Sequence, residues 1–355
     1  MKKKIKIYKK LKTSIKSNDK KYNFGFAILK ALLALDVIRN HCFNPKSTKN
    51  KIILLYFARR RIHVPSFFIL SFYFMHKELI LLNFKLLGKR LQRLLIPYIC
   101  WPIIIYFLNN NILHVYFRSI IKIPRKELKT QLLWAYDFVG QLWFQWVLIV
   151  STIIFFIVLF IFRKYGLFVL QLLLIFEYFL QYSGYNVKFY NSVSREKREC
   201  LGRFTEVFPS TVTGFTLAYF KIIDYIHNIK IKTFTLSLLV FNLVKKYNVF
   251  MVIKGQLYQG IIVNVRAVCL VFIFSLFPSE KIRNPKIINC LKHLTNYTAG
   301  IYYLHLNLLR YLKLFVKSID QGTFEGCLLI YFICYSISFI SMKFVGKTFL
   351  RHLFS

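Results

Sequence analysis

Apolar residues in this chain form long blocks, unlike the alternating pattern of a half-buried strand or the one-faced stripe of a surface helix. The longest block without a charge, residues 142–162 (LWFQWVLIVSTIIFFIVLFIF), has 21 residues. At about 1.5 Å of rise per residue, a helix of this length crosses a hydrocarbon layer roughly 30 Å thick. The block therefore predicts a transmembrane helix.

Comparable blocks recur along the chain and predict ten spans. They cover residues 23–43, 62–80, 94–111, 141–162, 165–183, 204–222, 231–249, 258–277, 296–315 and 325–345. Lys245 and Lys246 interrupt the seventh block, so nine spans is the alternative count. The pattern predicts an all-α fold, a polytopic transmembrane bundle of about ten helices.

The composition supports one membrane-embedded domain. Hydrophobic residues make up 56% of the chain and its mean hydropathy is +0.47, which is too apolar for a soluble domain of 355 residues. We find no internal repeat and no Gly/Ser linker. We therefore expect a basic tail at 1–21, a transmembrane domain at 22–348 and a short C-terminal tail at 349–355.

The formal charge of +39 bears on which partner the protein binds. In a soluble protein it would indicate nucleic acid, but in a membrane protein it is typical of loops that lie on anionic headgroups. We expect the lipid bilayer as partner and no nucleic acid. Residues 1–21 contain ten lysines and one acid, which predicts a cytosolic N-terminus for this multi-pass integral membrane protein. The sequence leaves the membrane compartment open.

Metal and nucleotide chemistry lack a sequence signal. The seven cysteines are scattered, without a CxxC pair or metal-ligand spacing, so we expect neither a disulfide framework nor a metal site. Phosphate-binding loops, dinucleotide fingerprints and zinc-protease motifs are also missing from the sequence.

The first predicted span contains ionisable residues in the segment KALLALDVIRNHCF. Lys30 and His41 are eleven positions apart, so they face one side of a helix about 16 Å apart along its axis. Imidazole can take and return a proton near neutral pH. Taken alone, His41 is more readily explained as a satisfied polar residue at the membrane edge.

Three further segments carry candidate residues. Arg90 and Arg93, in KRLQRLLIPYICW, share a helix face and suit phosphate oxygens, although positive-inside anchoring explains them as well. Trp143 opens the segment LWFQWVL and is typical of an aromatic belt. Tyr302 and His305 lie in GIYYLHLNLL, where a histidine can also serve in helix packing.

The order of these motifs resembles the acyltransferase 3 family of integral membrane acyltransferases. The resemblance rests on a basic residue ten positions ahead of a histidine, then VPSFFILSFYF, RLQRLLIP, LWF and GIYYLH, and it covers residues 23–345. Members of this family O-acylate sugars, polysaccharides, lipids and other small acceptors. The resemblance implies an enzyme that transfers an acyl group from acyl-CoA, a co-substrate, to a hydroxyl acceptor, with no bound cofactor.

The resemblance also implies roles for individual residues. His41 would be the general base or a transient acyl carrier, and Lys30 or Arg39 would stabilise the developing oxyanion. Arg90 and Arg93 would hold the phosphates of acyl-CoA. The residues expected to line the site are Arg39, Trp143, Tyr302 and His305.

The chain departs from the family pattern at three positions. Phe72 stands where relatives have glycine, Lys30 where arginine is commoner, and Gln141 where histidine is frequent. A catalytically inactive relative is therefore one alternative. A small-molecule or ion transporter is the other, because charged residues such as Asp36, Glu177 and Arg266 fall inside predicted spans.

Overall fold

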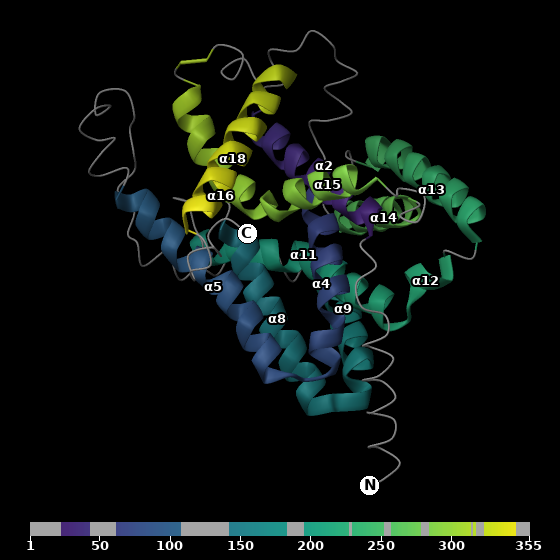
Figure 1. Cartoon of the computed structure of the whole chain (residues 1–355). Coiled ribbons are helices and arrows are strands. Elements are labelled where there is room, and N and C mark those ends of the chain that lie inside the picture. The colour runs from purple at the N-terminus through teal and green to yellow at the C-terminus, as the bar shows by residue number, and fades with distance from the viewer. Residues whose placement is uncertain are drawn as a thin grey trace.

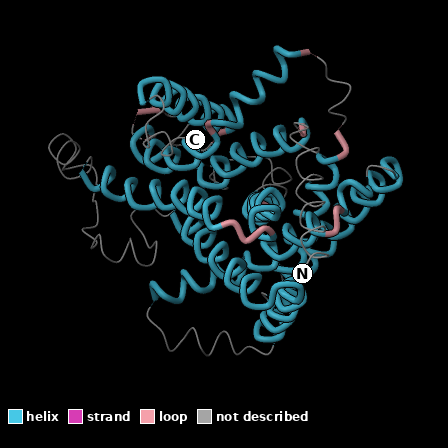
Figure 2. Tube along the Cα trace, turned by 60° about the horizontal axis from the view of Figure 1, so that its bottom comes forward, coloured by secondary structure: helices cyan, strands magenta, loops and turns pink. Residues whose placement is uncertain are grey.

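The structure is a computed structural model that describes residues 23–42, 62–107, 142–182, 195–226, 229–251, 257–277, 284–313, 315–316 and 323–345. Within these ranges all regular structure is helical and no residue is in a strand (Figure 2). The predicted all-α fold is therefore confirmed. Figure 1 shows α4, α5, α8 and α9 running together in the lower part, with α2, α16 and α18 above them and α13 at the periphery.

Each of the ten ranges predicted as spans overlaps a helix. These are α2 (Phe24–Cys42), α4 (His63–Ile80), α5 (Phe84–Phe107), α8 (Leu142–Phe162), α9 (Gly166–Tyr182), α11 (Arg195–Tyr219), α13 (Lys230–Met251), α14 (Leu257–Ser275), α16 (Thr298–Leu312) and α18 (Phe324–Val345). The short helices α12 (Ile222–Ile226) and α15 (Pro285–Asn296) lie between them. Helices α5 and α11 begin about ten residues before the predicted spans, because polar turns continue each helix ahead of its apolar block.

Two helical stretches among the described residues are long and apolar enough to cross a membrane, Leu142–Phe179 and Phe324–Phe344. The first contains α8 and α9, joined by the short 3-10 helix Arg163–Tyr165. The chain folds back there, since a Cβ added at Gly166 would lie 2.7 Å from Leu159 Cδ2. The number of spans beyond these stretches stays a prediction.

The outer surfaces of these helices are apolar. Large side chains are exposed along α8, α9 and α18, among them Ile161, Phe168, Ile175, Phe176, Phe332 and Phe344. Extended exposed apolar surface marks a membrane or protein interface instead of a surface that faces water.

Helices α2 and α4 run antiparallel. Near the start of α2, the Phe26 ring lies 5.6 Å from the ring of Phe74 in the second half of α4. Near the end of α2, Asp36 pairs with His63, the first residue of α4. This is the arrangement expected of consecutive spans.

Helices α4 and α8 run parallel. Ring centroids lie 4.6 Å apart between Phe68 and Phe144, and also between Phe72 and Phe155 further along both helices. Parallel packing is expected of the second and fourth spans of a chain that crosses a bilayer repeatedly.

Phe72, which stands where the resembled family has glycine, is accommodated in the core. Phe72 is fully buried and packs against Phe155. Ile69 lies one turn before Phe72 on α4. Gly214 of α11 is so close to it that an added Cβ would overlap the backbone oxygen of Ile69. The close approach of α4 to a neighbouring helix is therefore made by Gly214, and it does not require a small residue at position 72.

Candidate active site

The structure brings together the two histidines of the sequence motifs. His41 lies in the last turn of α2 and His305 in the middle of α16. Their ring centroids are 5.3 Å apart and their planes are tilted by 43°. Two imidazoles at this distance can both reach one substrate group that lies beside them.

The His305 ring has a defined orientation. It is buried, with 1% of its surface exposed, and Nδ1 lies 2.8 Å from the backbone oxygen of Tyr302. Since a carbonyl oxygen only accepts, Nδ1 carries the proton and Nε2 carries a lone pair. Nε2 is buried and has no hydrogen-bond partner among the described residues.

An aromatic cluster lies on one side of His305. The Tyr302 ring lies 5.9 Å from His305 and 5.2 Å from Phe144 of α8. On the same turn of α8, Trp143 lies under the guanidinium of Arg203, at 5.1 Å. The predicted site-lining residues Trp143 and Tyr302 therefore belong to neighbouring parts of one aromatic cluster.

Lys30 lies at a different place from His41. Its Nζ is 4.9 Å from the Phe74 ring centroid, and the like charge of Arg90 acts on it. Because Lys30 and His41 are on the same straight helix, they are about 16 Å apart along its axis. The structure thus places Lys30 with Arg90, away from the histidine pair.

The two arginines of α5 differ in environment. The Nε atom of Arg90 is buried without a hydrogen-bond partner in the described part of the chain, whereas Arg93 is exposed. Neither Lys30 nor Arg90 forms an ion pair within the described ranges. The carboxylate of Glu78 acts on Arg90 without forming an ion pair with it, so the guanidinium keeps donors for an anion from outside the chain.

Arg39 faces away from His41, because residues two positions apart lie on opposite sides of a helix. Its guanidinium pairs with Asp36. The other oxygen of Asp36 accepts a hydrogen bond from Nδ1 of buried His63 at 2.8 Å. Sequence reasoning missed His63, although the cost of a carboxylate inside a predicted span signals that Asp36 needs a partner.

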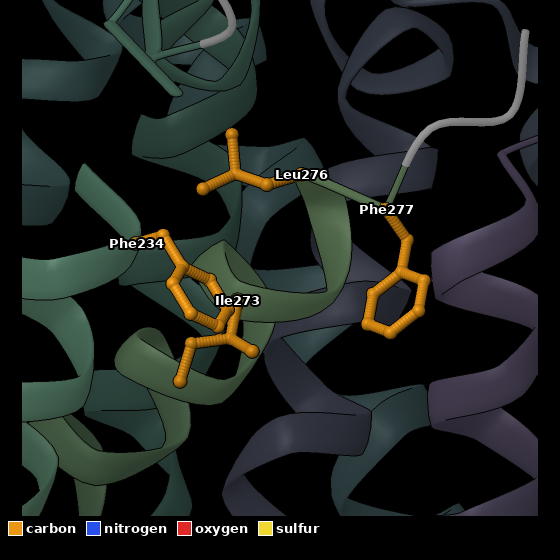
Figure 3. Close-up of a pocket in the computed structure, with 4 residues that line it drawn as sticks. All are labelled: Phe234, Ile273, Leu276 and Phe277. Carbon is orange, nitrogen blue, oxygen red and sulfur yellow. The ribbon is translucent and has the colours of Figure 1, made fainter. Parts of the chain in front are cut away.

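Other features add no further chemistry. Gln141 lies outside the described residues. Among the described residues, no group of His, Cys, Asp or Glu could hold a metal ion. The pocket in Figure 3, between α13 and α14, is lined by Phe234, Ile273, Leu276 and Phe277, which are apolar and cannot move a proton.

Comparison with known proteins gives one clear match. Residues 23–343 match the family whose description is an acyltransferase domain, Acyl_transf_3. No curated protein and no solved structure matches the chain significantly. The family match covers most of the chain and confirms the resemblance seen in the motifs. The chain therefore belongs to the acyltransferase 3 family and is an acyltransferase that transfers groups other than aminoacyl groups.

Proposed function

We propose that this protein is a multi-pass membrane O-acyltransferase that moves an acyl group from acyl-CoA to a hydroxyl acceptor such as a sugar, a lipid or another small molecule. The observation that carries the proposal is the contact between the His41 and His305 rings, which joins two motifs from distant parts of the chain. Family membership supplies the reaction class.

The basic end of α2 supports acyl-CoA as donor. Lys30 and Arg90 are close enough for their charges to repel, and phosphate oxygens would relieve that repulsion. Arg93, on the exposed side, would meet the donor first. We therefore assign Lys30 to donor binding together with both arginines, because about 16 Å separates it from His41.

The histidine end of α2 supports transfer chemistry. His41 has two available roles there, as a general base or as a transient carrier of the acyl group. A donor that binds at Lys30 and reacts at His41 must extend along α2. The pantetheine arm of CoA is a flexible chain that can lie in this direction while the phosphates stay at the basic end.

Helix directions support the multi-pass placement. Helix α2 is antiparallel to α4, and α4 is parallel to α8, as repeated crossings require. With the basic N-terminal tail in the cytosol, the start of α2 and the start of α5 lie on the cytosolic side. Lys30 and Arg90 would then be on the side where acyl-CoA is available.

Thiol release tests the activity directly. Purified protein in lipid nanodiscs would be given acetyl-CoA or longer acyl-CoAs, with a membrane extract that supplies lipids and glycans as hydroxyl acceptors. We expect enzyme-dependent release of free CoA and an acylated product detectable with labelled acyl groups. If no donor gives release above a blank without enzyme, the chain is an inactive relative and the proposal is wrong.

Arg90→Gln is expected to weaken donor binding. Losing a charge-assisted contact of about 1.5–3 kcal/mol should raise the KM for acyl-CoA roughly 10- to 100-fold and change kcat by less than about threefold. The inhibition constant of free CoA should rise in parallel. Arg93→Gln should have a smaller effect, because its side chain is exposed.

Lys89→Gln is the matched control for the Arg90 variant. Lys89 is an exposed cation one position away on α5, so it shares the overall charge change, but its charge is not among those that act on Lys30. A similar increase in KM for both variants would mean that general electrostatic attraction, and not a site at Arg90, holds the donor.

Transport is the second candidate function. It is favoured by buried charged residues, since Glu177 and Arg266 are both less than one-tenth exposed and lie in α9 and α14. Solute uptake into vesicles without any acyl donor would support transport. Turnover of acyl-CoA without uptake would support the enzyme.

A further inference from the structure

His305 has an acceptor atom that acyl transfer by His41 alone leaves unused. The Nδ1–H group donates to the Tyr302 carbonyl at 2.8 Å, which holds the ring in one tautomer. Nε2 therefore has a lone pair, yet it is buried and unpaired among the described residues. Burying an unpaired acceptor costs free energy, and such atoms in native structures call for an explanation.

The neighbouring His41 ring bears on that explanation. The His305 and His41 rings lie 5.3 Å apart and are tilted, not stacked. A hydroxyl oxygen can sit at the apex of a triangle with one nitrogen of each ring, at about 2.8 Å from both. The Tyr302 ring lies 5.9 Å from His305, and Phe144 packs against Tyr302 in turn.

We propose that His305 is the catalytic base that takes the proton of the acceptor hydroxyl, which leaves His41 to act on the acyl group. This inference rests on the proposed acyltransferase function. The acceptor O–H bond breaks as a proton binds Nε2, and the oxygen forms the ester bond with the acyl carbon. The thioester C–S bond breaks, and the leaving thiolate takes up the proton that His305 received, so no other reactant is needed.

The surroundings of His305 suit this role. The Tyr302 carbonyl orients the imidazole as a carboxylate does in a carboxylate–histidine pair. His41, by contrast, is exposed at the end of α2, where a long donor can reach it. The titratable groups that act on His305 are His41 and His63, and His63 is already bonded to Asp36.

A nucleophile that needs no base distinguishes the role of His305 from the role of His41. Hydroxylamine attacks an acyl group as a neutral amine, whereas a hydroxyl acceptor must lose its proton. The His305→Asn variant keeps an N–H donor for Tyr302 but lacks the base. We expect transfer from acetyl-CoA to the hydroxyl acceptors of a membrane extract to fall about 100-fold or more, and hydroxylamine-dependent thiol release to stay within about threefold.

His76→Asn is the matched control. His76 makes the same hydrogen bond to a carbonyl three residues earlier, from Nδ1 to Tyr73 at 2.7 Å, and lies in α4 away from the histidine pair. It should leave both reactions unchanged. Equal losses with both probes in His305→Asn, or an unchanged hydroxyl reaction, would overturn the assignment. A wild-type protein that releases no thiol with either probe would instead remove the acyltransferase proposal itself.

The His305→Gln variant is a second test that separates loss of the base from loss of folded protein. Its longer amide fills more of the imidazole volume, and the amount of folded protein is measured by size-exclusion chromatography alongside activity. The same split between hydroxyl and hydroxylamine reactions in both variants supports the base. A split that appears in one variant only contradicts it.

Discussion

Replacing His41 with alanine is expected to abolish acyl transfer from acyl-CoA. With His305 as the base, His41 acts on the acyl group, and the loss of such a catalytic or acyl-carrying imidazole costs at least about 10²–10⁴-fold in rate. The hydroxyl and hydroxylamine reactions should fall together, because both need the activated acyl group. The measurement is thiol release by protein purified at wild-type yield in nanodiscs.

His293→Ala is the control for the His41 variant. His293 is an exposed histidine in α15, and none of its contacts reaches the histidine pair. We expect wild-type turnover from it. Turnover that persists in His41→Ala would refute the assignment of His41 to the reaction, even if the protein proved to be an active acyltransferase.

Gly214→Ala is expected to destabilise the protein strongly. The new Cβ would lie 2.8 Å from the Cα of Ile69, so two backbones must move apart. Overpacking of a well-packed core typically costs roughly 1–3 kcal/mol, and here a rigid helix must shift instead of a flexible side chain. Thermal unfolding in detergent should show a lower midpoint and a lower yield of monodisperse protein.

Gly202→Ala gives the opposite expectation within the same helix. Nothing lies within 4 Å of a Cβ built at Gly202, and alanine is the better helix former by about 1 kcal/mol. This variant should be as stable as the wild type or slightly more stable. If both substitutions had the same effect, the close approach of α11 to α4 would not exist as described.

The sequence predicted the positions of the helices well, because long apolar blocks have one clear physical reading. Helices α5 and α11 begin ahead of the predicted spans, since residues such as Lys89 and Arg203 break the apolar pattern without breaking the helix. Lysine and arginine have good helix propensity, so they can continue a helix, whereas their low hydropathy excludes them from a predicted transmembrane span.

The candidate site was predictable only in part. The resemblance named His41 and His305, but nothing in spacing alone brings α2 and α16 together, because their contact depends on tertiary packing. The pairing of Asp36 with His63 and the proximity of Lys30 to Arg90 depend on the antiparallel packing of α2 against α4 and on the path of α5. Only the distance between Lys30 and His41 along their helix could be calculated from the sequence.

Lys30 and His41 on one uninterrupted helix act as a molecular ruler. The separation of about 16 Å between their backbone positions is set by helical hydrogen bonding, so no loop movement can shorten or lengthen it. A compound that contacts both residues must span this fixed length. Selection among donors would therefore depend on the reach between the anionic group and the reactive carbon, and inserting one residue between positions 30 and 41 would turn one end by about 100° relative to the other.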